Sequence, residues 1–213
     1  MAFSIRNPEL ARIEDRYNSL KHIIEEYPIL LQEYHEKQEK ILEREAKECS
    51  EGDPEVFQSI FSQYLCASDN TESHLDCFYQ SIFVLAYAFY KSAISFLGKK
   101  LKTRELINAI CKSENLTLSK ETEEYIDFID KKVKVLRNQL IHNNYGKPKQ
   151  INTIKALCRE YSELSLNNDI ISLSGTDLLN LSIEKELYVL KELYNKLGYK
   201  HKQTKDQKNK DSS

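Results

Sequence analysis

Apolar residues near the start of the chain follow a helical repeat. Asn7-Pro8-Glu9 is a typical helix start, with a capping side chain, a proline in the first turn and an acid. The apolar positions that follow alternate between spacings of three and four, as in a coiled coil: Leu10, Ile13, Tyr17, Leu20, Ile24 and Tyr27. Pro28 is expected to kink or interrupt this helix. Residues 32–48 are highly charged and predict a solvated helix.

Further helical patterns fill most of the remaining chain. Asp53-Pro54-Glu55 starts a second helix, and Phe78–Leu97 is a long helix rich in aromatic and aliphatic residues. Its uninterrupted apolar run, Ile82–Tyr90, is too short to cross a membrane, and Lys91 follows directly. The sequence therefore predicts a buried core helix here. Three later segments also have helical patterns: 121–143, 151–164 and 183–197.

One stretch departs from the helical pattern. Residues 169–181 contain alternating apolar positions and Gly175, which predict a minor β-hairpin. Beyond Tyr199 the chain is lysine-rich and without apolar residues, as in a disordered tail. We therefore expect an all-α fold with a long N-terminal helix and this small hairpin. The predicted division is an N-terminal helical extension (1–52), a helical domain (53–198) and a tail (199–213).

Composition supports this fold class and narrows the choice of partners. Five glycines and four prolines in 213 residues are too few for a fold of many short strands. Thirty-one basic and 33 acidic residues give a net charge of −2. This balance excludes a generally basic nucleic-acid-binding surface, so any RNA contact must come from a local patch. The N-terminus does not have the pattern of a signal peptide, and we expect a cytoplasmic protein without membrane contact.

Neither cysteines nor carboxylates predict a metal site. The five cysteines are odd in number and lack C-x-x-C spacing, as expected for reduced thiols in the cytosol. His74 and Cys77, with Cys66 upstream, lack a visible fourth ligand. Asp127 and Asp130 lie three apart, but acids near a helix start usually interact with the helix dipole. We therefore expect no metal and no cofactor.

The candidate chemistry lies in the segment 130–148. An apolar stripe docks its helix on the core: Ile126, Ile129, Val133, Leu136 and Leu140. Lys134, Asn138 and His142 are spaced by four and form a polar row one turn apart. Arg137 flanks this row, and Lys131 lies near it. One helix thus gains a cationic, hydrogen-bonding surface within a slightly acidic chain.

These residue types suit metal-free cleavage of RNA. An arginine guanidinium binds phosphate bidentately, and a histidine transfers protons near neutral pH. In attack by a 2′-hydroxyl on the adjacent phosphate, His142 would be acid or base, Arg137 would stabilise charge, and Asn138 would orient the ring or the phosphate. The substrate-binding candidates are Lys131, Lys134, Asn143 and Tyr145.

Helical geometry separates the two main candidates. Arg137 and His142 are five residues apart, which is roughly 140° around an ideal helix. One helix therefore does not easily direct both side chains at one atom. Two copies related by a two-fold axis would supply an arginine and a histidine each, which predicts a homodimer.

The pattern Arg137-Asn138-x-x-x-His142, late on a helix of a small all-helical chain, resembles the R-x(4–6)-H motif of the HEPN superfamily. The resemblance extends over roughly residues 55–197, with Phe78–Leu97 similar to the preceding core helix. It implies a dimeric helical bundle, often a metal-independent endoribonuclease of bacterial toxin–antitoxin, abortive-infection or antiviral defence systems. It also implies Arg137 and His142 as the catalytic pair and an antitoxin or defence-system protein as a partner. One HEPN toxin group has a tyrosine two residues after the histidine, where this chain has Asn144.

Two other functions remain open. A non-catalytic module would bind nucleic acid, a nucleotide or a partner protein through the same cationic row, without turnover. A structural adaptor would use the charged N-terminal helix and Phe78–Leu97 as protein interfaces. In either case Arg137 and His142 would be an ordinary salt-bridge donor and a partner of the helix dipole.

Overall fold

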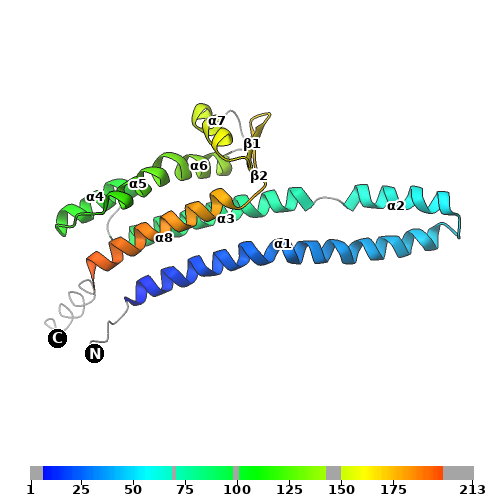
Figure 1. Cartoon of the computed structure of the whole chain (residues 1–213), viewed down its shortest axis with the longest axis horizontal. Helices are drawn as coiled ribbons and strands as arrows, with labels where there is room; N and C mark the ends of the chain where they lie inside the picture. Colours follow the sequence, from blue (N-terminus) through cyan, green and yellow to red (C-terminus); the bar gives the residue numbers. More distant parts are fainter. Residues whose placement is uncertain (1–6, 69–70, 98–100, 143–149, 199–213) are drawn as a thin grey trace.

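The longest element is helix α1 (Pro8–Cys49), which extends along most of the described molecule (Figure 1). We describe this and the other elements in a computed structural model that covers residues 7–68, 71–97, 101–142 and 150–198. The predicted cap is confirmed, because the Asn7 side chain accepts a hydrogen bond from the Glu9 amide at 3.0 Å. Pro28 does not interrupt α1. Ile24 and Leu31, on either side of the proline, are both buried, so packing holds the helix across the lost hydrogen bond.

Helices α2 (Pro54–Ser68) and α3 (Thr71–Phe96) return along α1 in the opposite direction (Figure 1). The reversal uses Glu51 and Gly52, whose φ angles are 49° and 89°. Helix α2 contacts only the far half of α1, whereas α3 contacts the near half and reaches the centre of the molecule. The far half of α1 and α2 therefore form a two-helix arm.

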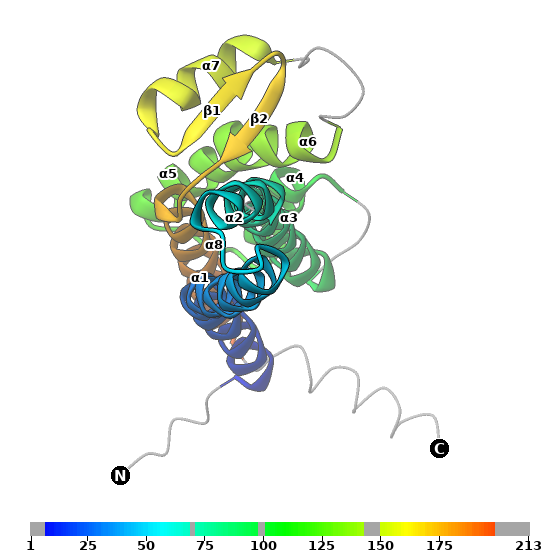
Figure 2. The same cartoon turned by 90° about the vertical axis from the view of Figure 1, so that its right-hand side faces the viewer.

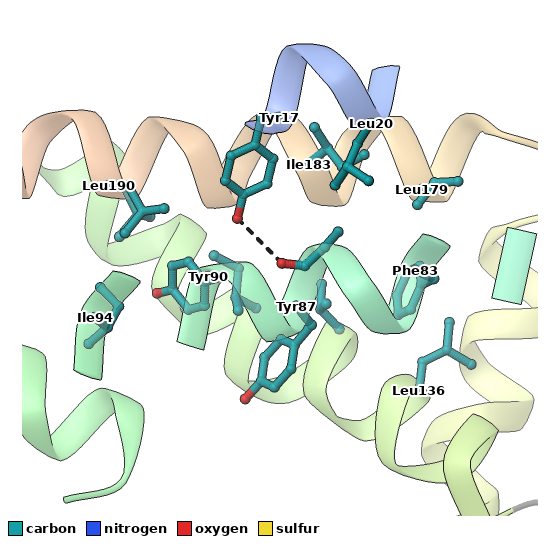
Figure 3. Packing of buried hydrophobic residues seen from close by; sticks show 14 of the residues in the cluster. Tyr17, Leu20, Phe83, Tyr87, Tyr90, Ile94, Leu136, Leu179, Ile183 and Leu190 are labelled. Carbon is teal, nitrogen blue, oxygen red and sulfur yellow. Dashed lines mark hydrogen bonds between the residues drawn. The ribbon is translucent and has the colours of Figure 1, made fainter. Parts of the chain in front are cut away.

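The core lies between α1, α3 and the last helix, α8 (Asp177–Leu197). Tyr17 of α1 points toward α3, where its hydroxyl contacts the Ala86 carbonyl at 3.4 Å (Figure 3). Leu190 and Ile183 of α8 are fully buried in the same cluster. The near half of α1 thus belongs to the core of the helical body, and the predicted domain division at residue 52 stays a prediction.

A second layer covers α3 and α8 on the side opposite α1 (Figure 2). It consists of α4 (Thr103–Ser113), α5 (Lys120–Phe128), the π-helical turn η1 (Ile129–Val133) and α6 (Lys134–His142). Of the expected helix over 121–143, residues 121–142 are described and form one helical run, whose middle has π-type bonding.

The predicted hairpin is present, shifted toward the N-terminus. After α7 (Ile151–Glu160), strands β1 (Leu164–Asn167) and β2 (Ile170–Leu173) pair antiparallel. The turn is Asn168-Asp169, with φ angles of 51° and 65°, which suit a two-residue hairpin turn. Gly175, expected in the turn, instead lies just before α8. The carboxylate of Glu163 accepts hydrogen bonds from the amides of Asp177 and Leu178 and so caps α8.

The fold class expected from the sequence is thus confirmed: long helices with one small hairpin. Within the described ranges, every helix is too short or too polar to cross a membrane.

Candidate functional site

The helix that carries the candidate residues is firmly docked. Four of the five residues of the predicted apolar stripe are buried: Ile126, Ile129, Val133 and Leu136. The fifth, Leu140, is only partly buried against the core. Leu136 of α6 and Phe83 of α3 lie close together in the core (Figure 3). Because this stripe fixes the rotation of α6, it also determines which neighbouring side chains face α3 and which face solvent.

The π turn contributes to that rotation. The Lys134 amide bonds to the Ile129 carbonyl, five residues back, instead of the usual four. One extra residue in a turn rotates everything that follows by about 100°. Ile129, the first residue of the turn, and Leu136, which follows the turn, are both buried. Turns of this kind are frequent at functional sites, and this one directly precedes the candidate residues.

Arg137 lies at the edge of the packed face. Its guanidinium carbon is 5.7 Å from the ring centroid of Tyr87 on α3, a cation–π distance. Its Nη1 donates a hydrogen bond to Oδ1 of Asn138 at 3.0 Å. Its Nε is buried and has no hydrogen-bond partner. An unpaired buried donor is costly, and this N–H group of Arg137 lacks the compensating contact that buried donors usually have.

Asn138 and His142 occupy the outer side of α6. Both are exposed, and His142 is the last residue of the helix. Among the described residues, the His142 imidazole has no hydrogen-bond or ion-pair partner. Since α6 is a regular α-helix from Lys134 to His142, the angular separation of Arg137 and His142 remains roughly 140°. Within one chain the guanidinium turns toward α3 while the imidazole faces solvent.

The predicted lysines are engaged in ion pairs. Lys131 Nζ lies 2.5 Å from Asp127 Oδ2, and Lys134 Nζ lies 2.6 Å from Asp130 Oδ1. Hydrogen bonds from Lys131 and Arg104 lower the pKa of Asp127. The hydrogen bond to Asp130 raises the pKa of Lys134. These two lysines therefore add little net positive charge to the surface expected to be cationic.

Two residues near Arg137 escaped the sequence interpretation. Tyr87 is buried under the guanidinium, and burial raises the pKa of its phenol despite the nearby Lys134. Arg104 of α4 reaches across to Asp127. Tyr87 sits in an apolar run that only indicates a core helix, and Arg104 comes from another helix, so no local signal identified either.

The structure thus brings Arg137, Asn138 and Lys134 together on α6 and leaves His142 on a different side of the same helix. Asn143 and Tyr145 lie outside the described residues. The carboxylates considered as metal ligands, Asp127 and Asp130, are instead paired with cations. In the described part of the chain, no three histidine, cysteine or acidic side chains cluster as metal ligands would.

No protein-family model, curated protein or solved structure matches this chain. The resemblance to HEPN proteins rests on Arg137, Asn138 and His142, and on the helix on which they lie.

Proposed function

We propose that this protein is a metal-independent endoribonuclease of HEPN type, acting as a homodimer in a toxin or defence system. The observation that carries the proposal is the state of Arg137. In a region where Lys131, Lys134 and Arg104 all contact carboxylates, the Arg137 guanidinium has none within 4.0 Å among the described residues. It packs on Tyr87 and keeps a buried, unpartnered Nε. A phosphate oxygen is a suitable acceptor for that group.

The reaction needs no group beyond the chain and its substrate. The 2′-hydroxyl oxygen attacks the adjacent phosphorus and loses its proton to a histidine. The bond from phosphorus to the 5′ oxygen breaks, and that oxygen takes up a proton from a second acid. The products are a 2′,3′-cyclic phosphate and a 5′-hydroxyl. Arg137 stabilises the charge on the phosphoryl oxygens, and exposed His142 is the proton carrier.

Two copies of the chain complete this site. Arg137 and His142 of one helix diverge, whereas a two-fold axis beside α6 supplies an imidazole from each copy. An exposed apolar groove between α3 and α6 offers a surface for such a contact. Val84, Leu85 and Ala88 of α3 line a groove there with Leu140 of α6, and Leu85 is 40% exposed. The same pairing provides both a base and an acid.

Cleavage in the absence of divalent ions tests this function. Purified protein is incubated with labelled RNA and with total tRNA in EDTA, and the product ends are analysed. We expect 2′,3′-cyclic phosphate ends from the native chain. We expect a loss of at least about 100-fold in rate for Arg137→Ala and for His142→Ala, as is typical of transition-state and proton-transfer groups.

Matched controls come from other helices. His22→Ala removes an exposed histidine of α1, and Arg159→Ala removes an exposed arginine of α7. Both controls are expected to cleave like the native chain. Full activity in His142→Ala, or equal losses in His22→Ala, would contradict the proposed mechanism.

A partner-binding module is the second candidate, because one observation favours it. Lys131 and Lys134 are neutralised by neighbouring acids, which leaves little positive charge for holding a long RNA. The same experiment separates the two functions. RNA binding without cleavage, weakened by salt and by Arg137→Ala, would support the module instead of the enzyme.

A further inference from the structure

Helix α1 carries a second apolar stripe, which lies beside its buried face and is exposed. Its members are all substantially exposed: Ile23 (44%), Leu30 (58%), Tyr34 (55%) and Ile41 (44%). Their spacings of seven, four and seven residues keep them within about 20° of one line along an α-helix. We call these four residues the outer stripe. A helix with such a repeat has the pattern of a coiled-coil seam.

The outer stripe is distinct from the seam that packs α1 into the molecule. The buried residues Leu20, Ile24 and Leu31 lie roughly 60–100° around the helix from Ile23. Neighbouring helices cover α1 from one side, and in the end-on view α1 forms the edge of the molecule (Figure 2). The outer stripe is therefore an apolar face of this long helix left exposed by the rest of the described chain.

Charges beside the outer stripe change sign along the helix. On the flank away from the buried seam, Glu26 and Glu33 lie toward the N-terminal half. On the same flank, Lys37, Lys40 and Arg44 lie toward the C-terminal half. Among the described residues these three cations have no carboxylate within 4.0 Å, although the sequence spacing would have allowed Glu33–Lys37 and Glu36–Lys40 pairs.

The stripe is also symmetric about its middle. Ile23 and Ile41 lie nine residues on either side of Gln32, and Leu30 and Tyr34 lie two residues on either side. Turned end for end, the stripe meets itself with Ile23 opposite Ile41 and Leu30 opposite Tyr34. In that antiparallel arrangement Glu26 of one helix lies near Lys37 and Lys40 of the other.

We propose that the outer stripe is an interface with a second copy of this chain, in which two α1 helices pair antiparallel as a coiled coil. Pattern symmetry and charge complementarity both favour a copy of this chain over an unrelated helix. The proposal is independent of the ribonuclease proposal, because α1 and α6 lie on opposite sides of the core. If the α1 contact and the two-fold contact beside α6 both form, the chain builds oligomers larger than a dimer.

Neighbouring residues on different faces of α1 provide a matched pair of variants. Leu30 belongs to the outer stripe, whereas Ile29, also exposed at 55%, points about 100° away from it. We expect Leu30→Lys to weaken self-association at least about tenfold. Both copies of the chain carry the substitution, so each dimer places two lysines in the interface. We expect Ile29→Lys to leave it unchanged. Light scattering over a concentration series, with circular dichroism as the folding control, measures both.

Charge reversal tests the pairing more finely. Glu26→Lys with Glu33→Lys should weaken association, and adding Lys37→Glu, Lys40→Glu and Arg44→Glu should restore it. Equal association of the native, Leu30→Lys and Ile29→Lys chains would overturn the proposal. So would a native chain that remains monomeric.

Disulfide cross-linking tests the direction of the helices. One chain carries Ile23→Cys and a mass tag, and another carries Ile41→Cys. Antiparallel pairing joins the two different chains to each other, whereas parallel pairing joins each to its own kind. The native chain, with exposed Cys49 and Cys77, gives the background. Cross-links within each kind alone would contradict the antiparallel arrangement.

Discussion

Glu186 is a carboxyl group in the middle of an apolar core. It is fully buried in α8, and its Oε2 accepts a hydrogen bond from the Tyr17 hydroxyl at 3.1 Å. Its Oε1 has no partner. Burial raises the pKa of Glu186 to about 8, against the weaker opposing effect of the Tyr17 hydrogen bond. The side chain is therefore protonated in the folded protein at neutral pH.

This group gives stability a measurable pH dependence. The folded protein holds the Glu186 proton more tightly than the unfolded chain does. Its contribution to the free energy of unfolding is therefore complete below pH 4.5 or so and declines as the pH rises toward about 8. Glu186→Gln keeps an acceptor for Tyr17 and removes the titration. We expect this variant to be more stable than the native chain at pH 8, by an amount on the order of a few kcal/mol.

Urea unfolding of both chains at several pH values measures the effect. The difference between the two chains isolates Glu186 from carboxylates of opposite behaviour, such as Glu192, whose hydrogen bonds outweigh its burial and lower its pKa to about 2. A difference that does not change between pH 5 and pH 8 would contradict the assignment.

The sequence alone identifies three residues of the candidate site but not the side chains that surround them. Arg137, Asn138 and His142 are recognisable because their spacing is local and their residue types are chemically distinctive. Their surroundings are not local. Tyr87 lies fifty residues before Arg137 in the chain, and the contact depends on how α6 lies on α3. The ion pairs that neutralise Lys131 and Lys134 are i,i−4 contacts, which spacing alone could have indicated.

Helix α5 begins at a cap that links two distant segments. The Ser119 hydroxyl accepts a hydrogen bond from the Thr122 amide at 3.2 Å. It also donates to Glu192 Oε2 of α8 at 2.7 Å, and the Ser119 amide donates to Oε1 of the same carboxylate at 2.8 Å. This cap therefore fixes α5 against α8 as well as starting the helix.

We expect Ser119→Ala to destabilise the protein by about 1 kcal/mol or somewhat more, because it removes the cap and one partner of a partly buried carboxylate. Ser113→Ala serves as the control, since that hydroxyl only bonds to the Ile110 carbonyl at the end of α4. Chemical denaturation measures both variants. Equal effects at the two serines would argue against a special role for the cap.

Sequence patterns located most helices well and failed at two irregular places. The cap at Asn7 is a local signal and is confirmed. The predicted hairpin lies too late in the chain, because glycine is the usual turn signal and here Asn168 and Asp169 adopt the left-handed backbone that glycine favours. The π turn has no sequence signal, because the spacing of the apolar residues Ile129, Val133 and Leu136 is that of a regular α-helix.

The molecule as a whole divides into a well-packed body and a thin arm. None of the described side chains of α2 is buried, and the far half of α1 buries little beyond Leu31 and Ala46. In the arm, Phe57 and Phe61 stack at 5.5 Å but remain half exposed. Two helices cannot enclose an apolar core as α1, α3 and α8 together do.

We therefore expect the arm to open more readily than the body. Amide hydrogens of residues 38–65 should exchange faster than those of α3 residues 79–94 and of α8, as measured by mass spectrometry in native buffer.

Pairing of the outer stripe should slow exchange near residues 34–41 in the native chain relative to Leu30→Lys. Equal protection of arm and body would show that the arm is stabilised by a contact not described here.

The π turn at Ile129–Val133 has a consequence for how this protein can evolve. In a regular helix the loss of one residue turns everything that follows by about 100°. A loss inside the π turn would also replace its five-residue hydrogen bond with the usual four-residue one, so the two changes cancel and α6 keeps its orientation. Arg137 would stay on Tyr87, and Leu136 would stay in the core. Lineages descended from this chain are therefore expected to tolerate a difference of one residue in length between Ile126 and Arg137, which a regular helix at this place would not.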